Sequence, residues 1–289
     1  MKHNAFAACH PAVNFLFFAA AIGFGVVLQH PAYLAAGCIG SGLCYLLIKG
    51  KSGFPFLGSL LILGAVLAGI NPIFNTRGTR ILFRLFGRPY TLEALCYGLA
   101  LAGIFLIMML WFACYNTVVT SDKFISLFGS FIPSLSLVLV MVLRMIPGLT
   151  RKARQITGAR SAIGKGVTAA STSKEKVSHG MTVLSSLTDW ALEGSLVTAD
   201  SMRARGYGTT RQTHFQIYRF TARDGILLAV ILLLSTAVIA SGGFSASYTP
   251  ELKISPVSGG FAAYCALLLL PSVLQIKEAV IWHILKSKI

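Results

Sequence analysis

The sequence predicts an all-α, polytopic membrane protein with about six transmembrane helices and a cytoplasmic coupling-helix insertion between the fourth and the fifth. Hydrophobic residues make up 55% of the 289 residues and charged residues make up 12%. That charged share is about half of the share in soluble domains. Long apolar runs alternate with short polar breaks, as in a chain that crosses a bilayer repeatedly. Between residues 121 and 223 these runs give way to an amphipathic, basic section that is too polar to lie within lipid.

Six apolar runs are long enough, alone or with neighbouring residues, to cross a hydrocarbon core. The predicted spans are approximately residues 12–29, 31–48, 55–70, 92–118, 225–242 and 258–276. Turn and capping signals bound them, namely His10-Pro11, His30-Pro31, Lys49-Gly50-Lys51, Asn71-Pro72, Thr91 and Gly242-Gly243. The predicted organisation is therefore an amino-terminal membrane section (1–120), a cytoplasmic and interfacial section (121–223) and a carboxyl-terminal membrane section (224–289).

The charge is strongly positive, with 25 lysines and arginines against nine acidic residues. Because the positive charges lie mostly beside or between apolar runs, we interpret them as cytoplasmic loops rather than as a nucleic-acid-binding surface. A cytoplasmic amino terminus places most of them inside, and we expect the first apolar run to remain as a membrane helix. The conflict is the stretch 71–90, which would lie outside although it carries Arg77, Arg80, Arg84 and Arg88.

The sequence pattern of section 121–223 predicts three helices. Ser121 or Asp122 caps a short interfacial helix that Pro133 ends, with apolar residues at Phe124, Leu127, Phe128 and Phe131. The apolar run 134–146 is too short to span a bilayer, and Pro147 starts or kinks a basic helix that ends near Gly164 and Gly166. A further helix covers about 174–205, with Gly206 and Gly208 available to terminate it.

The two long helices end in matching chemistry, Ala159-Arg160-Ser161 and Ala204-Arg205-Gly206. An arginine in a last helical turn is also favoured by the helix dipole and the terminal carbonyls, so a capping role is the structural alternative for each. A guanidinium on a rigid helix end, however, offers a planar fork of donors that can grip a carboxylate on a partner. Two such tips suit a pair of similar grooves, as a dimer of nucleotide-binding subunits presents.

These tips resemble those of the transmembrane T component of energy-coupling factor (ECF) transporters. The resemblance extends to residues 143–147, 153–161 and 201–208, and upstream to Asn71-Pro72, Gly78 and residues 91–95. It is weakest over residues 1–60 and after 224, and Ser161 stands where many members have glycine.

The resemblance implies that the chain is a non-catalytic subunit of a vitamin or micronutrient importer in a prokaryotic plasma membrane. Its partners would be two ABC ATPase subunits and a small membrane S component that binds the substrate. The ATPase-docking residues would be Ala159, Arg160, Ser161, Ala204, Arg205 and Gly206. The chain would bind no cofactor or metal directly, and ATP would be used by the partner subunits.

Two other classes of function are weighed against this one. An ion-coupled secondary transporter needs ionisable residues at mid-membrane, whereas Glu93, Asp224 and Glu278 fall near the ends of apolar segments. An integral-membrane enzyme needs a cluster of catalytic groups, and we interpret Asp189, Glu193 and Asp200 as a solvated helix face. The string Gly164-Lys165-Gly166 lacks the spacing and the hydroxyl of a phosphate loop, so we expect no ATP hydrolysis by this chain.

Overall fold

A computed structural model describes residues 5–75, 81–85, 88–129, 133–167, 172–209, 218, 220–242, 246–248, 253–254, 256 and 258–286. The chain divides into two compact units. We call the first, Met1–Phe124 with Tyr218–Ile289, the bundle, and the second, Ile125–Ile217, the insert. The two membrane sections that the sequence separates therefore pack together as one unit.

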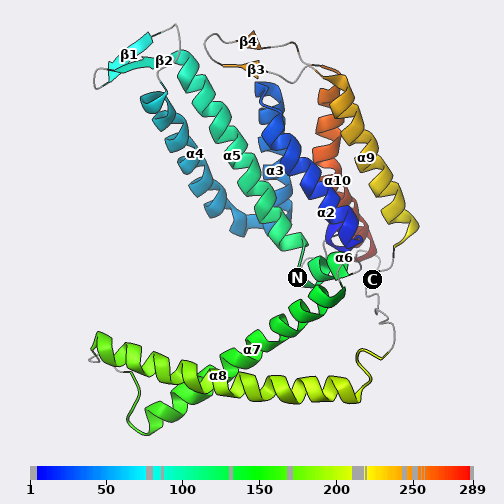
Figure 1. Cartoon of the computed structure of the whole chain (residues 1–289). Coiled ribbons are helices and arrows are strands. Elements are labelled where there is room, and N and C mark those ends of the chain that lie inside the picture. Colours follow the sequence, from blue (N-terminus) through cyan, green and yellow to red (C-terminus); the bar gives the residue numbers. More distant parts are fainter. Residues whose placement is uncertain are drawn as a thin grey trace. The chain divides into compact units, whose positions relative to one another are not determined.

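The bundle is built from apolar helices (Figure 1). They are α1 (Ala5–Ala8), α2 (Pro11–Val27), α3 (Pro31–Lys49), the 3-10 turn η1 (Gly50–Gly53), α4 (Phe54–Phe74), α5 (Leu92–Val118), α9 (Ala222–Ser241) and α10 (Gly260–Lys286). Each of the six predicted apolar segments is helical. Among the described residues, four helical stretches are long and apolar enough to cross a membrane: Pro31–Phe74, which comprises α3, η1 and α4, then Leu92–Val118, Ala222–Ser241 and Gly260–Glu278. Helix α2 is apolar but shorter.

Local signals in the sequence account for where these helices begin. His10 and His30 cap α2 and α3, because each Nδ1 accepts a hydrogen bond from a backbone N–H two residues on, at 3.2 Å in both cases. The proline that follows each histidine has no N–H to satisfy. Thr91 caps α5 as predicted, accepting from the N–H of Ala94 at 3.4 Å. The histidines act here as helix caps, a role that their spacing alone does not reveal.

Two helices run further than predicted. Asn71-Pro72 lies inside α4 rather than ending it, and α10 continues through Pro271 to Lys286. Pro72 stands in the last turn of α4, where a missing N–H removes only one helical hydrogen bond.

Two short antiparallel hairpins accompany the helices and were not predicted. Strand β1 (Ile81–Leu85) pairs with β2 (Arg88–Thr91) between α4 and α5, and β3 (Ala246–Ser247) pairs with β4 (Lys253–Ile254) between α9 and α10. Within the arginine-containing stretch 71–90, the piece beginning at Ile81 is thus a strand. Arg77 and Arg80 lie outside the described residues.

Helix α5 lies at the centre of the bundle. Its Trp111 is fully buried, with its ring edge-on to Phe17 (5.5 Å between centroids) and Phe18 (6.0 Å) of α2. Gly98 brings α5 close to α4, because a Cβ at that position would lie 2.7 Å from the carbonyl oxygen of Ala68. Large aromatic contacts on one side and a close backbone approach on the other hold α5 in place.

The bundle has two distinct ends. At one end Tyr248, beside the β3–β4 hairpin, donates to the carbonyl of Gln29 at 2.6 Å and lies 6.1 Å from the Tyr97 ring of α5. At the other end the N–H of His10 donates to Asp224 Oδ1 at 2.9 Å, and the chain leaves for the insert and returns from it. The β1–β2 hairpin therefore lies at the end of the bundle opposite His10 and Asp224 (Figure 1).

The insert contains the helices expected from its periodicity. Helix α6 (Ser121–Gly129) leads from the bundle into it, and α7 (Pro133–Ala162) and α8 (Ser173–Ala204) follow. Pro133 begins α7, and α7 is continuous through Pro147, so the apolar run and the basic helix form one element. Phe131 lies outside the described residues.

Helices α7 and α8 pack against each other through few side chains. The ring of Trp190 lies 3.7 Å from the position of a Cβ on Gly148, and the Lys152 ammonium is 6.0 Å from the ring centroid. None of the residues of α8 is buried. The helix depends on local stabilisation at its start, where the N–H of Thr172 donates to Glu175 Oε2 at 2.9 Å. Hydrogen bonds from Thr172 lower the pKa of the Glu175 carboxyl.

Candidate docking site

The first tip is the carboxyl-terminal turn of α7 with the segment that follows it. The N–H of Ile163 donates to the carbonyl of Ala159 (3.3 Å), and the N–H of Lys165 donates to the carbonyl of Arg160 (2.9 Å). Gly164 has a φ of 73°, which allows the chain to reverse here. The terminal carbonyls of α7 are thus satisfied by backbone donors, and the Arg160 guanidinium is not needed as a cap.

Gly166 closes the first tip against Ser161. A Cβ on Gly166 would lie 2.6 Å from the Ser161 hydroxyl oxygen and 2.9 Å from its Cα. No larger residue fits at 166 without moving this turn. The Gly164-Lys165-Gly166 string, which resembles a fragment of a phosphate loop, therefore has a structural role in folding the chain back at the helix end.

The Arg160 side chain is oriented by a residue from α8. Its Nε donates to His179 Nδ1 at 3.1 Å, and the same Nδ1 lies 3.1 Å from the carbonyl oxygen of Lys165. One ring nitrogen can serve only one of these contacts at a time: a neutral imidazole with its proton on Nε2 accepts from Arg160, and the other tautomer donates to Lys165. While Nε is held in this way, the two terminal nitrogens of Arg160 remain available to a partner.

The second tip ends α8. The N–H of Arg205 donates to the carbonyls of Ser201 and Met202, both at 3.2 Å, and the N–H of Tyr207 also reaches Met202 O at 3.0 Å. Gly206 has a φ of 80°, so it permits this terminating turn. Backbone donors again satisfy the helix end. The Arg205 side chain is exposed and has no hydrogen bond or ion pair within the part of the chain that the structure describes.

The two tips lie far apart in the insert. Arg160 lies beside His179 near the start of α8, and Arg205 follows the last residue of that helix. The helical stretch between His179 and Arg205 covers about 39 Å at a rise of 1.5 Å per residue. Because both guanidinium groups are mounted on helix ends and neither caps its own helix, the arrangement can engage two separate acidic grooves.

A polar cluster that the sequence analysis did not identify lies where the insert leaves the bundle. Lys123, only 6% exposed, donates through its Nζ to the carbonyls of Ala7 and of Val118, the latter at 2.9 Å. With the Asn14 amide turned so that its oxygen faces Lys123, that oxygen accepts at 3.2 Å and the amide nitrogen donates to Phe6 O at 2.8 Å. Burial lowers the pKa of the Lys123 ammonium group. The sequence feature that could have indicated this cluster is Asn14, a polar residue within the apolar run of α2.

The acidic residues of α8 that the sequence singles out do not belong to a buried cluster. Asp189, Glu193 and Asp200 are exposed along α8. Within the described residues there is no group of three or more histidine, cysteine or acidic side chains that could hold a metal ion.

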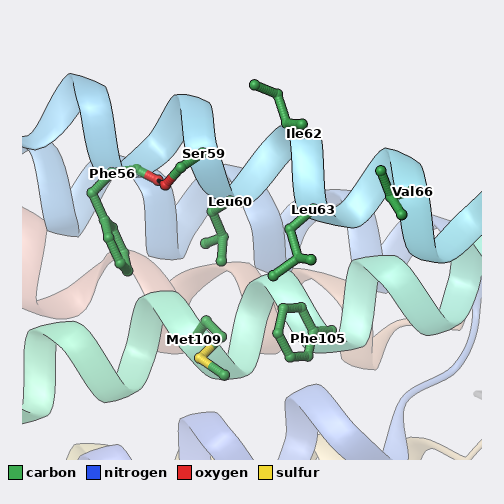
Figure 2. Close-up of a pocket in the computed structure, with 8 residues that line it drawn as sticks. All are labelled: Phe56, Ser59, Leu60, Ile62, Leu63, Val66, Phe105 and Met109. Atoms are coloured by element: carbon green, nitrogen blue, oxygen red, sulfur yellow. Dashed lines mark hydrogen bonds between the residues drawn. The ribbon is translucent and has the colours of Figure 1, made fainter.

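A shallow apolar crevice of about 510 Å³ runs between α4 and α5 (Figure 2). Phe56, Leu60 and Leu63 of α4 face Phe105 and Met109 of α5. The one hydroxyl of its lining, on Ser59, donates to the carbonyl of Phe56 within the same helix at 2.9 Å. A polar substrate would therefore find no group to orient it in this crevice.

No protein-family model matches this chain, and no curated protein matches its sequence. The functional interpretation rests on the chemistry of the two tips.

Proposed function

We propose that this chain is the transmembrane coupling subunit, the T component, of an ECF-type ABC importer. It would transmit the ATP-driven motion of two ATPase subunits to a substrate-binding S component, for uptake of a vitamin or micronutrient. The observation that carries the proposal is the pair of helix ends at Arg160 and Arg205, where backbone N–H groups do the capping and leave the guanidinium groups for a partner.

The mechanism assigned to the chain is mechanical. Each guanidinium docks in an acidic groove of one ATPase subunit. Closure of the ATPase dimer on ATP brings the tips toward each other, and α7 and α8 carry that displacement to the S component. The flanking residues Ala159, Ser161, Ala204 and Gly206 are small, which lets a groove close around each arginine.

The distribution of charge supports a cytoplasmic insert in a plasma membrane. Helix α3 begins at the end of the bundle that holds the two hairpins, where the Tyr33 hydroxyl lies 3.4 Å from Ser258 Oγ. Lys49 and Lys51 therefore lie toward the end that holds His10 and Asp224. Lys123 and Arg223 belong to the same end. This bias follows the positive-inside rule, with the arginines of the β1–β2 hairpin as the exception.

An ion-coupled transporter is the second candidate, and the position of the buried acids argues against it. Glu93 and Asp224 are buried, but each stands in the first turn of its helix rather than at mid-membrane. A coupling-ion site is expected near the middle of the bilayer. Uptake by the purified chain alone in liposomes, without ATPase subunits, would favour this second candidate.

The decisive test is the charge reversal Arg205→Glu with Arg203→Glu as the matched control. Arg203 is exposed two residues earlier on α8, so its reversal makes the same change in net charge on a different side of the helix. We expect Arg205→Glu to weaken copurification of the ATPase subunits about 30-fold or more, as for other truncated or reversed interface charges. The Arg203→Glu control should copurify the ATPase subunits as the unmodified chain does. Equal copurification of the ATPase subunits with both variants would contradict the proposal.

A further inference from the structure

Three arginines form a stripe along the side of α7 that faces away from α8. Arg144, Arg151 and Arg154 are exposed, and their spacings of seven and three residues place them on one side of the helix. Gly148, Lys152 and Arg160, which face Trp190 and His179 of α8, are half-buried on the other side. We call these three residues the arginine stripe. It is distinct from the docking tips.

The arginine stripe carries uncompensated charge. The sequence of α7 contains no acidic residue, and within the described residues no ion pair involves any of the three arginines. The Nε of Arg151 donates to the carbonyl of Pro147 at 3.3 Å, which leaves its terminal nitrogens available. The stripe extends over about 15 Å, given the helical rise of 1.5 Å per residue. Such a row of forked donors matches anionic phosphate groups.

The residues that precede the arginine stripe indicate which anion it meets. The first half of α7 exposes large apolar side chains on several sides, at Leu135, Val138, Val140, Val142 and Ile146. A helix that is apolar around its circumference is stable in an apolar medium, and this run is too short to span a bilayer. Val140 precedes Arg144 by one turn, so a single side of α7 passes from apolar to cationic. An acidic protein surface would satisfy the arginines but leave the apolar side chains exposed.

We propose that the arginine stripe binds the headgroups of anionic phospholipids while the apolar half of α7 enters the adjacent acyl region. Helix α7 is then a lipid-anchored element whose position depends on the charge of the surrounding leaflet. The inference rests on α7 alone and holds whether or not the tips dock on ATPase subunits.

The test follows hydrogen exchange of α7 in the detergent-solubilised full chain during titration with phosphatidylglycerol. We expect the lipid to slow exchange in α7, and phosphatidylcholine to have no such effect. The triple variant Arg144→Gln, Arg151→Gln, Arg154→Gln should raise the half-maximal phosphatidylglycerol concentration about tenfold or more, because each basic residue near an anionic surface contributes several-fold to binding. Circular dichroism checks that the variant keeps its helices.

The control is Lys174→Gln, Lys176→Gln, Arg203→Gln, which removes the same charge from exposed positions of α8. This control should have the same half-maximal phosphatidylglycerol concentration as the unmodified chain. Glycerol phosphate, the soluble headgroup, should not slow exchange, because the apolar contact is missing. An equal shift in both triple variants, or slowing by glycerol phosphate alone, would overturn the proposal. So would a stripe variant that titrates normally but loses copurifying ATPase subunits, since the stripe would then be a protein contact.

Discussion

At the scale of single residues, the clearest organising feature is a buried cation whose hydrogen-bond acceptors, among the described residues, are carbonyl oxygens rather than carboxylates. The Lys123 ammonium group donates hydrogen bonds to carbonyls near the ends of two helices, α1 and α5. The partial negative charge of a helix carboxyl terminus takes the place of an acidic partner. Asn14 completes the arrangement from α2. One side chain therefore joins three helices at the position where α6 leaves the bundle.

We expect Lys123→Met to destabilise the bundle, with Lys49→Met as the control. Methionine fills similar volume but leaves the buried carbonyl acceptors unpaired, a loss of about 1–3 kcal/mol for each buried polar group. Lys49 is exposed at the end of α3, so its replacement should leave stability unchanged. Thermal unfolding in detergent measures both, and identical midpoints for the two variants would contradict the assigned role.

The tips also show how a residue acquires its role from a distant partner. Arg160 and Arg205 each follow an alanine and precede a small residue, but their surroundings differ, since His179 orients the first and the second is exposed. The two arginines are therefore not equivalent in the isolated chain. Release of Arg160 from His179 Nδ1 would leave that nitrogen able to bond Lys165 O instead.

At the scale of elements, close packing between α4 and α5 fixes one side of the bundle. Gly98 faces the backbone of Ala68 and lies beside Asn71, where a Cβ would be 2.9 Å from the Asn71 Cβ. Small residues at helix contacts allow this approach in membrane proteins. In contrast, Gly58 on α4 has open space around the position of a Cβ.

This contrast gives a matched pair of substitutions, Gly98→Leu and Gly58→Leu. The first must push α4 and α5 apart, and overpacking of this kind costs about 1–3 kcal/mol. The second adds a side chain in open space. We expect a lower unfolding temperature and a smaller monodisperse fraction in detergent for Gly98→Leu only. A Gly58→Leu variant that is equally destabilised would show that the helices, and not their contact, are sensitive to the change.

At the scale of the whole molecule, the chain consists of a bundle made from both ends of the sequence and an insert made from its middle. Both connections to the insert leave the bundle at the same end, near His10 and Asp224 on one side and Lys123 on the other. Under the proposed coupling function, two tips in one insert can be moved by two partners.

If the proposed function holds, the two tips act as a bivalent ligand for a pair of ATPase subunits. Arg160→Glu combined with Arg205→Glu should reduce apparent affinity for the ATPase subunits at least about 100-fold beyond either single variant, because one intact tip raises the effective concentration of the other. The control is Lys174→Glu with Arg203→Glu, which changes net charge by the same amount. Copurification and substrate uptake measure the effect. A double variant no worse than the milder single variant is incompatible with bivalent docking.

Local sequence patterns predict the features that depend on neighbours along the chain. Hydrophobic run length gave the helices of the bundle, and glycine placement gave the ends of α7 and α8, because helix formation and termination involve residues within one or two turns. Contacts between distant segments, in contrast, emerge from the packing of the helices. Lys123 reaches Ala7, Asp224 accepts from His10, and His179 orients Arg160. These pairings depend on how the helices pack in space, which no local pattern encodes.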